Sequence, residues 1–274
     1  MAAAATPTYS HILFHVDGRI AYVTMNRPEK RNALSVAHMQ ELIACFRAIG
    51  EDRTIAAVIL RGNGPAFCAG HDLNELVGRT PDFYRYVFDV CTTLMETIQS
   101  IPQPVIAQVH GMATAAGCQL VATCDLAVAS EDARFATPGV KIGLFCSTPM
   151  VAVSRNLPRK KVMEMLLTGE PISAQEALRY GLVNRVVPRE ALEAETRALA
   201  EKIAAASPFV VGLGKQAFYR QLEMPQPQAY AYAREVMSFN ALAADAQEGI
   251  CAFLEKRPPR WGGYAQGPDR SGEA

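Results

Sequence analysis

The pattern of apolar and polar positions predicts a sheet that begins with a hairpin. Residues 11–16 and 19–25 have the character of strands, and the Asp17-Gly18 dipeptide between them favours a tight turn. Residues 55–60 and 105–109 are short runs that are apolar throughout, which is typical of strands buried on both faces. Such runs indicate the interior of a largely parallel sheet.

Helices are predicted between these strands. Ser35 can cap a helix that runs to about residue 49, and Pro81 suits the first turn of a helix that reaches about residue 100. Residues 116–123 can form a short helix that packs closely through Ala and Gly. Because strands alternate with helices, we expect parallel strands that are joined by right-handed crossovers.

The second half of the chain is increasingly helical. The pattern predicts strands at 126–129, 133–135 and 182–187, a loop at 143–149, helices to about residue 167, and a short helix capped by Ser173. From residue 188 to about residue 254 almost every segment has helical character, with breaks near Pro208 and Pro225. We therefore expect an α/β core over residues 1–205 and a helical region over residues 206–274.

Two stretches of small residues follow the buried strands and are candidates for a site. Residues 67–73 read FCAGHDL, and residues 111–120 read GMATAAGCQL. Small residues let a ligand approach the main chain, and the N–H groups of a helix's first turn suit a negatively charged oxygen. Two such turns that face each other would form an oxyanion hole, and we expect it to bind the carbonyl of a thioester.

Composition excludes several other classes of function. Lys+Arg and Asp+Glu both number 27, so the basic excess of a nucleic-acid-binding protein is missing. The seven cysteines are dispersed and form no C-x-x-C pair, so we expect no metal site, and buried, reduced thiols. The N-terminus does not resemble a secretory signal, and no apolar run is long enough to span a membrane. We therefore expect a cytoplasmic protein with no membrane span.

The order of these features resembles the crotonase superfamily, also called the enoyl-CoA hydratase/isomerase family. The matching segments cover nearly the whole chain: NRP at 26–28, NAL at 32–34, residues 67–73, PVIA at 104–107, Gly111, GCQL at 117–120, Cys124-Asp125, AQEA at 174–177, GLV at 181–183, and residues 248–257. The resemblance implies a spiral of ββα units with a helical C-terminal region that forms trimers, often paired into hexamers. It also implies a lyase or isomerase of fatty acid metabolism that acts on acyl-CoA. Coenzyme A is then part of the substrate, and no separate cofactor is expected.

The resemblance also assigns roles to residues. The backbone N–H groups of His71 and Ala116 would hold the thioester oxygen, although the family usually has Gly where Ala116 stands. A Lys is common where Asn74 stands. Contacts to the substrate are expected from a further set, in which the last two residues reach CoA from a neighbouring subunit in some relatives: Lys30, Ala69, Asp72, Leu73, Asn74, Gly117, Phe253 and Lys256.

The positions of the catalytic acids depart from the family pattern. Hydratases of the family use two Glu residues, which by this alignment fall at Gln119 and Gly139. An amide does not titrate usefully and Gly has no side chain, so neither residue can act as a general acid or base. The sequence therefore does not support hydration by the usual pair, and it disfavours isomerases that keep a Glu at the second position.

Two alternatives remain open for the reaction. The segment 69–72 is similar to the decarboxylase branch that acts on methylmalonyl-CoA, as are Thr137-Pro138 and residues 253–257. Decarboxylation needs an enolate sink and no base that removes a C–H proton. The other alternative is a non-catalytic homologue that only binds acyl-CoA. The sequence does not specify the acyl group, although the apolar loop 143–146 is expected to shape its end of the pocket.

Several side chains have two interpretations. The His71 imidazole could transfer protons or only pack beside the pocket, and Gln119 could hold a water or satisfy a backbone group. Cys118 and Cys146 are expected to be core thiols. We expect structural roles for His110 and Asp125, and solvated positions for Glu75 and for the basic residues 159–161. Lys30 and Arg31 are expected to contact phosphate.

Overall fold

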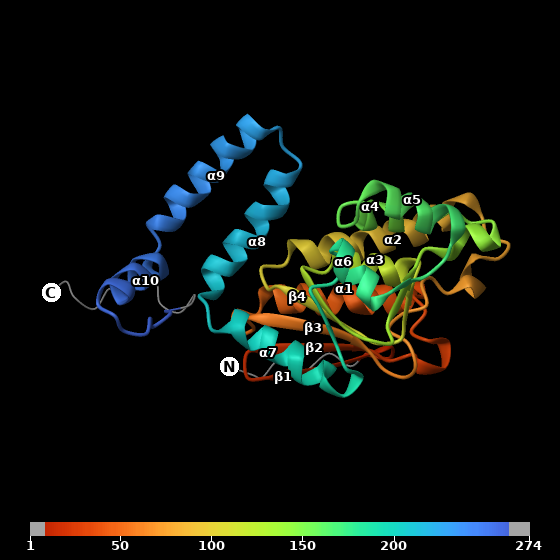
Figure 1. The fold of residues 1–274 in the computed structure, drawn as a ribbon, viewed down its shortest axis with the longest axis horizontal. Helices are drawn as coiled ribbons and strands as arrows, with labels where there is room; N and C mark the ends of the chain where they lie inside the picture. The colour runs from red at the N-terminus through yellow and green to blue at the C-terminus, as the bar shows by residue number, and fades with distance from the viewer. Residues whose placement is uncertain (1–8, 263–274) are drawn as a thin grey trace.

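A six-stranded sheet forms the centre of the fold (Figure 1). The computed structural model describes residues 9–262 of the 274-residue chain. The first two strands of the sheet pair antiparallel, and every later neighbour pairs parallel. In spatial order the strands are β1 (Ile12–Asp17), β2 (Ile20–Met25), β3 (Ala57–Gly62), β4 (Val105–Val109), β6 (Leu126–Ser130) and β9 (Arg185–Val187).

A second, smaller sheet branches from the end of β4. It consists of β5 (Met112–Thr114), β7 (Arg134–Ala136) and β8 (Ile172–Ser173), in the order β5-β7-β8. Only residues 110 and 111 separate β4 from β5, so the chain turns directly from one sheet into the other. An isolated bridge between Cys68 and Ala113 joins β5 to the segment after β3. Both predicted small-residue stretches therefore meet where the two sheets separate.

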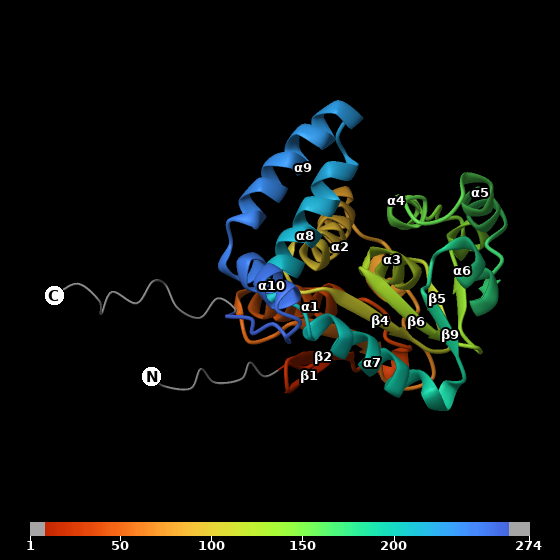
Figure 2. The same cartoon turned by 60° about the vertical axis from the view of Figure 1, so that its left-hand side comes forward.

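Helices cover both faces of the large sheet (Figure 2). The main apolar core lies between one face and α1 (Val36–Glu51), α2 (Pro81–Ser100) and α3 (Ala116–Thr123). A smaller core lies on the other face, where α7 (Leu192–Ala204) packs Leu192 and Ala200 against Tyr22 and Ile106. The parallel strands therefore carry apolar side chains on both faces of the sheet, and helices bury both faces, as expected for parallel strands.

Short elements connect these layers around the smaller sheet. They are η1 (Pro28–Lys30), η2 (Leu73–Leu76), η3 (Pro138–Ile142), α4 (Pro149–Val153), α5 (Arg159–Thr168), α6 (Ala174–Tyr180) and η4 (Arg189–Ala191). Ser173 and Glu176 form a full capping box at the start of α6, as the sequence predicts for Ser173.

The C-terminal helices extend away from the core (Figure 1). They are α8 (Pro208–Leu222), α9 (Gln226–Ala241) and α10 (Ala244–Leu254), and their exposed apolar side chains include Phe239, Leu242 and Phe253. A buried ion pair between Lys215 and Asp125 (2.8 Å) fastens α8 to the core. Such an apolar surface suits burial in an oligomer, and the trimer or hexamer stays a prediction. In the part of the chain that the structure describes, no helix is long and apolar enough to cross a membrane.

The predicted α/β fold with a largely parallel sheet and a helical C-terminal region is confirmed. The strand expected at 182–187 is too long, because the Leu182 N–H closes the end of α6 on the Ala177 carbonyl (2.8 Å) and pairing begins only at β9. The sequence does not predict β5, which lies within the second small-residue stretch, or the break between α9 and α10. The boundary between residues 205 and 206 stays a prediction, although it falls in the break between α7 and α8.

Candidate active site

The first small-residue stretch runs between two neighbouring segments that fix its main chain. On one side the Ala69 N–H donates to the Arg31 carbonyl (3.0 Å). On the other side the Cys68 N–H donates to the Met112 carbonyl (3.1 Å), and the Cys68 carbonyl accepts from Thr114 (3.0 Å). The stretch therefore behaves as a short central strand between the loop after η1 and β5.

The peptide unit between Gly70 and His71 has a fixed orientation. The Gly70 carbonyl accepts a hydrogen bond from the Leu34 N–H (2.7 Å), and the chain has no cis peptide bond among its described residues. In a trans peptide the C=O and the N–H point in opposite directions. The His71 N–H therefore points away from Leu34, and the described part of the chain offers it no hydrogen-bond acceptor.

The second candidate donor lies close to Gly70. A Cβ placed on Gly70 would lie 3.4 Å from the Ala116 nitrogen and 2.9 Å from the Ala115 Cβ. Ala116 is the first residue of α3, so its N–H has no acceptor within the helix. Two N–H groups from separate segments thus lie near each other without helical or strand partners.

Close packing and a strained turn hold the start of α3. A Cβ on Gly117 would lie 2.3 Å from the Cys68 carbonyl oxygen, so only Gly fits there. Ala115, which precedes the helix, has φ 50° and ψ −117°, a conformation that usually requires Gly. Its N–H donates to the Ala136 carbonyl (2.9 Å), which fixes the turn. Ala116 itself is tolerated, because the donor belongs to the main chain.

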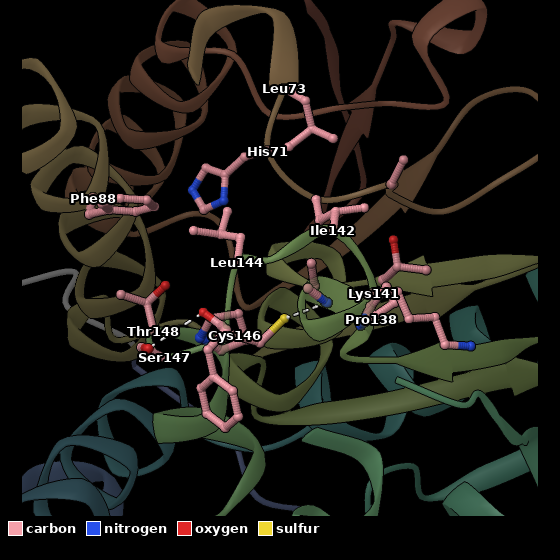
Figure 3. A pocket seen from close by; sticks show the side chains of 16 residues that line it. His71, Leu73, Phe88, Pro138, Lys141, Ile142, Leu144, Cys146, Ser147 and Thr148 are labelled. Carbon is pink, nitrogen blue, oxygen red and sulfur yellow. Dashed lines mark hydrogen bonds between the residues drawn. The ribbon is translucent and has the colours of Figure 1, made fainter. Parts of the chain in front are cut away.

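A cavity of about 390 Å³ opens beside this turn (Figure 3). Its walls come from the first small-residue stretch, the end of β5, α2 and the loop between η3 and α4. The lining residues are Ala69, His71, Leu73, Phe88, Thr114, Ala115, Pro138, Gly139, Lys141, Ile142, Leu144, Phe145, Cys146, Ser147, Thr148 and Pro149. None of these described lining residues carries a carboxylate.

The His71 imidazole is a neutral group in an apolar setting. Burial lowers the pKa of His71 to about 4, so the ring carries no charge near pH 7. Its edge faces the Phe88 ring at 5.4 Å between centroids, and its buried Nε2 has no hydrogen-bond partner in the described structure. A general base works best with a pKa near the working pH, so the low pKa favours a packing role over proton transfer.

The two positions at which the resemblance places the family's acids differ in their surroundings. Gln119 is buried in α3, where its Oε1 accepts a weak hydrogen bond from the Cys91 thiol at 3.8 Å. A Cβ on Gly139 would lie 1.9 Å from the Leu144 carbonyl oxygen and 2.9 Å from the Cys146 Sγ. The main chain of the loop thus fills the space that a side chain at position 139 needs.

The thiols near the site are core groups, as predicted. Burial raises the pKa of both Cys68 and Cys118 to about 12, and it also raises the pKa of Cys146, which lines the cavity. A thiol with a raised pKa is a poor nucleophile near neutral pH. The expectation that all seven cysteines are buried is wrong for Cys251, which lies exposed on α10.

The structure brings some of the expected substrate contacts together. Ala69 and Leu73 line the cavity with His71, while Gly117 packs behind it against Cys68. The Asp72 carboxylate is engaged by Arg27 and Asn74, and Lys30 is exposed at the end of η1. Substrate contacts by Asp72, Asn74 and Lys30 therefore stay predictions.

Phe253 and Lys256 lie apart from the cavity within one chain. Phe253 lies in a separate hollow beside Val210 and Trp261, and Figure 1 shows α10 at the end of the molecule away from α4. Contacts of Phe253 and Lys256 with a substrate therefore stay predictions.

Other expectations are settled by hydrogen bonds. The His110 Nε2 lies 2.8 Å from the Gly64 carbonyl oxygen, and Asp125 pairs with Lys215, so both have the structural roles expected. The solvated role predicted for Glu75 is wrong, because its carboxylate accepts from the Val36 N–H (2.8 Å) at the start of α1. Negative charge at a helix N-terminus is favourable, which explains this position.

Sequence reasoning misses part of the cavity wall. Phe88 reads as an ordinary apolar position of α2, and only its neighbours in the fold make it a wall of the cavity. The apolar loop at 143–146 does line the cavity through Leu144, Phe145 and Cys146. Arg27 is also missed, although it stands in the NRP segment, because its ion-pair partner Asp72 is distant in the sequence.

Comparisons with known proteins add an independent finding. A family model described as enoyl-CoA hydratase/isomerase matches residues 15–264. The chain is 50% identical over 243 residues to the mitochondrial enoyl-CoA hydratase domain-containing protein 3 of Rattus norvegicus, covering 88% of this chain and 81% of that protein. Because that relative is named a mitochondrial protein, a cytoplasmic location for this chain stays a prediction.

Solved structures agree with this similarity. A crystal structure of enoyl-CoA hydratase from Mycobacterium smegmatis has a TM-score of 0.90 and 50% identity, covering 92% of this chain and 99% of that chain. The crystal structure of human enoyl Coenzyme A hydratase domain-containing protein 3 also has a TM-score of 0.90, with 47% identity, covering 92% of this chain and 100% of that chain.

Proposed function

Because the chain belongs to the enoyl-CoA hydratase/isomerase family, we propose that it binds an acyl-CoA thioester and stabilises its enolate. In this proposal the thioester oxygen accepts hydrogen bonds from the His71 and Ala116 N–H groups. Donors that are fixed before the reaction stabilise charge as it develops on that oxygen, which typically changes the rate by about 10²–10³ per donor.

One observation carries this proposal. The Gly70 carbonyl is held by Leu34, so the His71 N–H is aimed away from Leu34 and has no acceptor among the described residues. The Ala116 nitrogen, which is also without an acceptor in its helix, lies close to Gly70. A carbonyl oxygen between the two groups would find two donors that have no other acceptor.

The surroundings of the cavity argue against hydration by the usual pair of acids. Hydration needs a group that delivers water to the β-carbon and a proton to the α-carbon. The described lining residues include no carboxylate, and the Leu144 carbonyl excludes any side chain at position 139. Loss of one positioned acid or base typically lowers the rate by about 10²–10⁴.

The same observations favour a second candidate, the decarboxylation of a 2-carboxyacyl-CoA such as methylmalonyl-CoA. The bond between the α-carbon and the carboxylate breaks, and its electron pair moves into the thioester to form the enolate as CO₂ leaves. A proton from solvent then returns to the α-carbon. The described lining is largely apolar, and the ammonium of Lys141, which also lines it, is paired with Glu170 (2.6 Å). Such a cavity disfavours the substrate carboxylate, which assists the loss of CO₂. This step requires no base in the cavity.

A binding protein without catalysis is the third candidate. It would use the same two N–H groups and the same cavity, and would leave the acyl-CoA unchanged. No side chain among the described lining residues excludes it, because binding needs neither acid nor base.

Parallel assays on the purified protein separate the three candidates. Crotonyl-CoA hydration is followed by the loss of the enoyl thioester absorbance, and methylmalonyl-CoA decarboxylation by the formation of propionyl-CoA. Calorimetry with butyryl-CoA measures binding without turnover. We expect binding in every case and decarboxylation to exceed hydration. Turnover of either substrate rejects the binding-only role, and rapid hydration of crotonyl-CoA contradicts the argument from the missing acids.

A further inference from the structure

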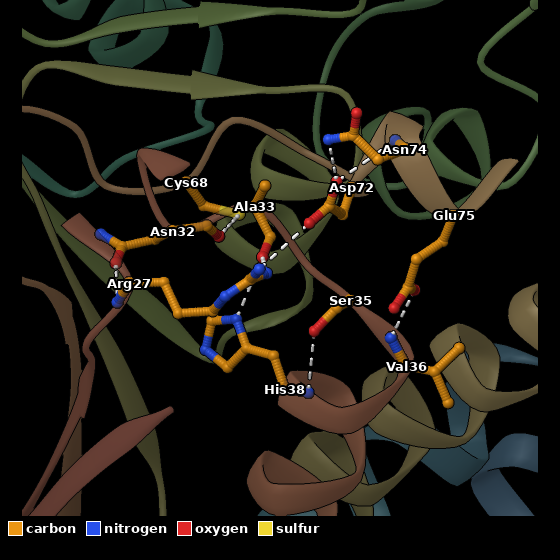
Figure 4. A network of polar contacts seen from close by, with 10 residues as sticks. All are labelled: Arg27, Asn32, Ala33, Ser35, Val36, His38, Cys68, Asp72, Asn74 and Glu75. Carbon is orange, nitrogen blue, oxygen red and sulfur yellow. Dashed lines mark hydrogen bonds and ion pairs between the residues drawn. The ribbon is translucent and has the colours of Figure 1, made fainter. Parts of the chain in front are cut away.

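Arg27 connects Ala33 to Asp72, the residue that follows the candidate donor His71 (Figure 4). Its Nη1 donates to the Ala33 carbonyl (2.5 Å), and its Nη2 donates to the Asp72 Oδ2 (3.0 Å). The two charged side chains are largely buried, with 14% and 10% of their surfaces exposed. One guanidinium thus joins the residue before Leu34 to the residue after His71.

Leu34 is the part of the chain that this bridge holds in place. Its N–H donates to the Gly70 carbonyl (2.7 Å), and its carbonyl accepts from the Asp72 N–H (3.0 Å). These two bonds flank His71 and fix the orientation of the peptide unit that carries the His71 N–H. If Leu34 moved away, nothing else among the described contacts would hold the Gly70 carbonyl on that side.

A second set of bonds anchors the base of the bridge. The Arg27 N–H donates to the Asn32 Oδ1 (2.9 Å), and the Asn32 Nδ2 donates to the Asn63 and Ala66 carbonyls, both at 2.9 Å. The backbone of Arg27 is therefore fixed, through Asn32, to the loop that follows β3. Because the Arg27 backbone is held in this way, a change in its guanidinium acts on the segment of Leu34 and on Asp72.

The Asp72 carboxylate is matched to this role. Burial pushes its pKa up, but hydrogen bonds from Asn74 and Arg27 outweigh burial and hold the pKa of Asp72 below its ordinary value. Its Oδ1 accepts from the Asn74 N–H (3.2 Å), which also caps η2. The charge is thus permanent near neutral pH, and both oxygens are committed to protein donors.

We propose that Arg27 is a positioning residue that aims the His71 N–H at the substrate carbonyl by clamping Leu34 and Asp72 on either side of it. This inference rests on the proposed function, because it assumes that His71 is an oxyanion donor. The planar fork of Arg can hold the Ala33 carbonyl and the Asp72 carboxylate together, whereas a Lys offers a single point charge. Arg27 contacts no part of the cavity, so it acts only through the main chain.

A chromophoric acyl-CoA tests the inference without any turnover. The absorbance of 4-(dimethylamino)cinnamoyl-CoA shifts to longer wavelength when its carbonyl is polarised by hydrogen bonds. The test compares the wild-type protein with Arg27→Met, Arg27→Lys and Asp72→Asn, and measures both the spectral shift and the Kd. The matched control is Arg61→Met, which breaks the Arg61–Glu193 ion pair (3.0 Å) away from the cavity.

We expect Arg27→Met and Asp72→Asn to lose at least half of the shift, while the Kd of Arg27→Met changes by less than about threefold, because Arg27 lies outside the cavity lining. Arg27→Lys should recover part of the shift, and Arg61→Met should retain all of it. A full shift in Arg27→Met overturns the inference, even if the melting temperature falls. If Arg27→Met does not fold, Asp72→Asn decides, because it keeps the shape of the side chain. Absence of a shift in the wild-type protein instead overturns the proposed function.

Discussion

The carbonyl oxygen of Leu144 occupies the space that a side chain on Gly139 would need. A Cβ on Gly139 would lie 1.9 Å from that oxygen. The loop is locked in this conformation by two bonds, since the Leu144 N–H donates to the Gly139 carbonyl (2.9 Å) and the Gly139 N–H donates to the Cys146 Sγ (3.3 Å). The main chain therefore leaves no room for a side chain at position 139, where the resemblance predicts the family's second acid.

Substitution of Gly139 should destabilise the protein. We expect Gly139→Ala to lower the free energy of unfolding by about 1–3 kcal/mol, because the loop must move to relieve the overlap. The measurement is urea denaturation followed by circular dichroism. Gly214→Ala is the control, because Gly214 lies in α8 with no atom within 4 Å of an added Cβ, and Ala favours the helix. Equal stability of Gly139→Ala and the wild type would contradict the closed loop.

Position 119, where the resemblance predicts the family's first acid, can be changed with less disturbance of the structure than position 139. Gln119→Glu changes one amide to a carboxyl of nearly the same shape, so we expect the helix α3 to remain intact. If the missing acid limits hydration, this variant should hydrate crotonyl-CoA faster than the wild type by a factor on the order of ten or more. Gln119→Met is the control, because it fills the site without a titratable group. An unchanged rate in Gln119→Glu would count against the account of the missing acids.

Substitution by Gly should have opposite effects on stability at Ala115, which precedes α3, and at Ala116, its first residue. Ala115 has φ 50°, a strained conformation for a residue with a Cβ, so Ala115→Gly should relieve strain worth about 1 kcal/mol. Ala116 is fully buried at the start of the helix, and Ala116→Gly should cost about 0.5–1 kcal/mol through lost packing and greater chain entropy. Thermal melts of both variants test the pair. A lower melting temperature for Ala115→Gly would show that the turn is not strained.

Local signals in the sequence predict much of the fold correctly. The bounds of α2, β4 and α3 are confirmed, because caps, Pro residues and short apolar runs act within a few residues. The turn from β4 into β5 is not predictable in the same way. Residues 112–114 form a strand only because Cys68 and β7 lie beside them, and those partners are distant in the sequence.

The sequence likewise predicts only those parts of the candidate site that depend on neighbouring residues. His71, Ala69 and Leu73 can be predicted as a group, since they stand within five residues of one motif and all line the cavity. The ion pair between Arg27 and Asp72 joins residues 45 positions apart, and the overlap at Gly139 depends on how one loop folds. Neither feature leaves a periodic or compositional signal, so only the three-dimensional structure reveals them.

The buried histidines predict how stability depends on pH. Burial lowers the pKa of His71 and of His38 to about 4 from the ordinary 6.5. Through these two rings the unfolded chain binds more protons than the folded chain between pH 4 and pH 6.5. Their contribution to the free energy of unfolding is therefore fully present above pH 6.5 and is lost as the pH falls toward 4. Each histidine contributes a loss on the order of 3 kcal/mol across this window.

Substitution of His71 isolates its share of this effect. His71→Gln removes one titrating ring and keeps the backbone N–H, so the excess of protons bound by the unfolded chain between pH 4 and pH 6.5 should fall by about one, and the slope of the unfolding free energy against pH should fall with it. The spectral shift of the bound chromophoric acyl-CoA should persist, because the proposed donor belongs to the main chain. Denaturant titrations at a series of pH values supply the slope, and His15→Gln, at an exposed position of β1, is the control. A shift that disappears in His71→Gln would assign the polarisation to the imidazole instead of the backbone.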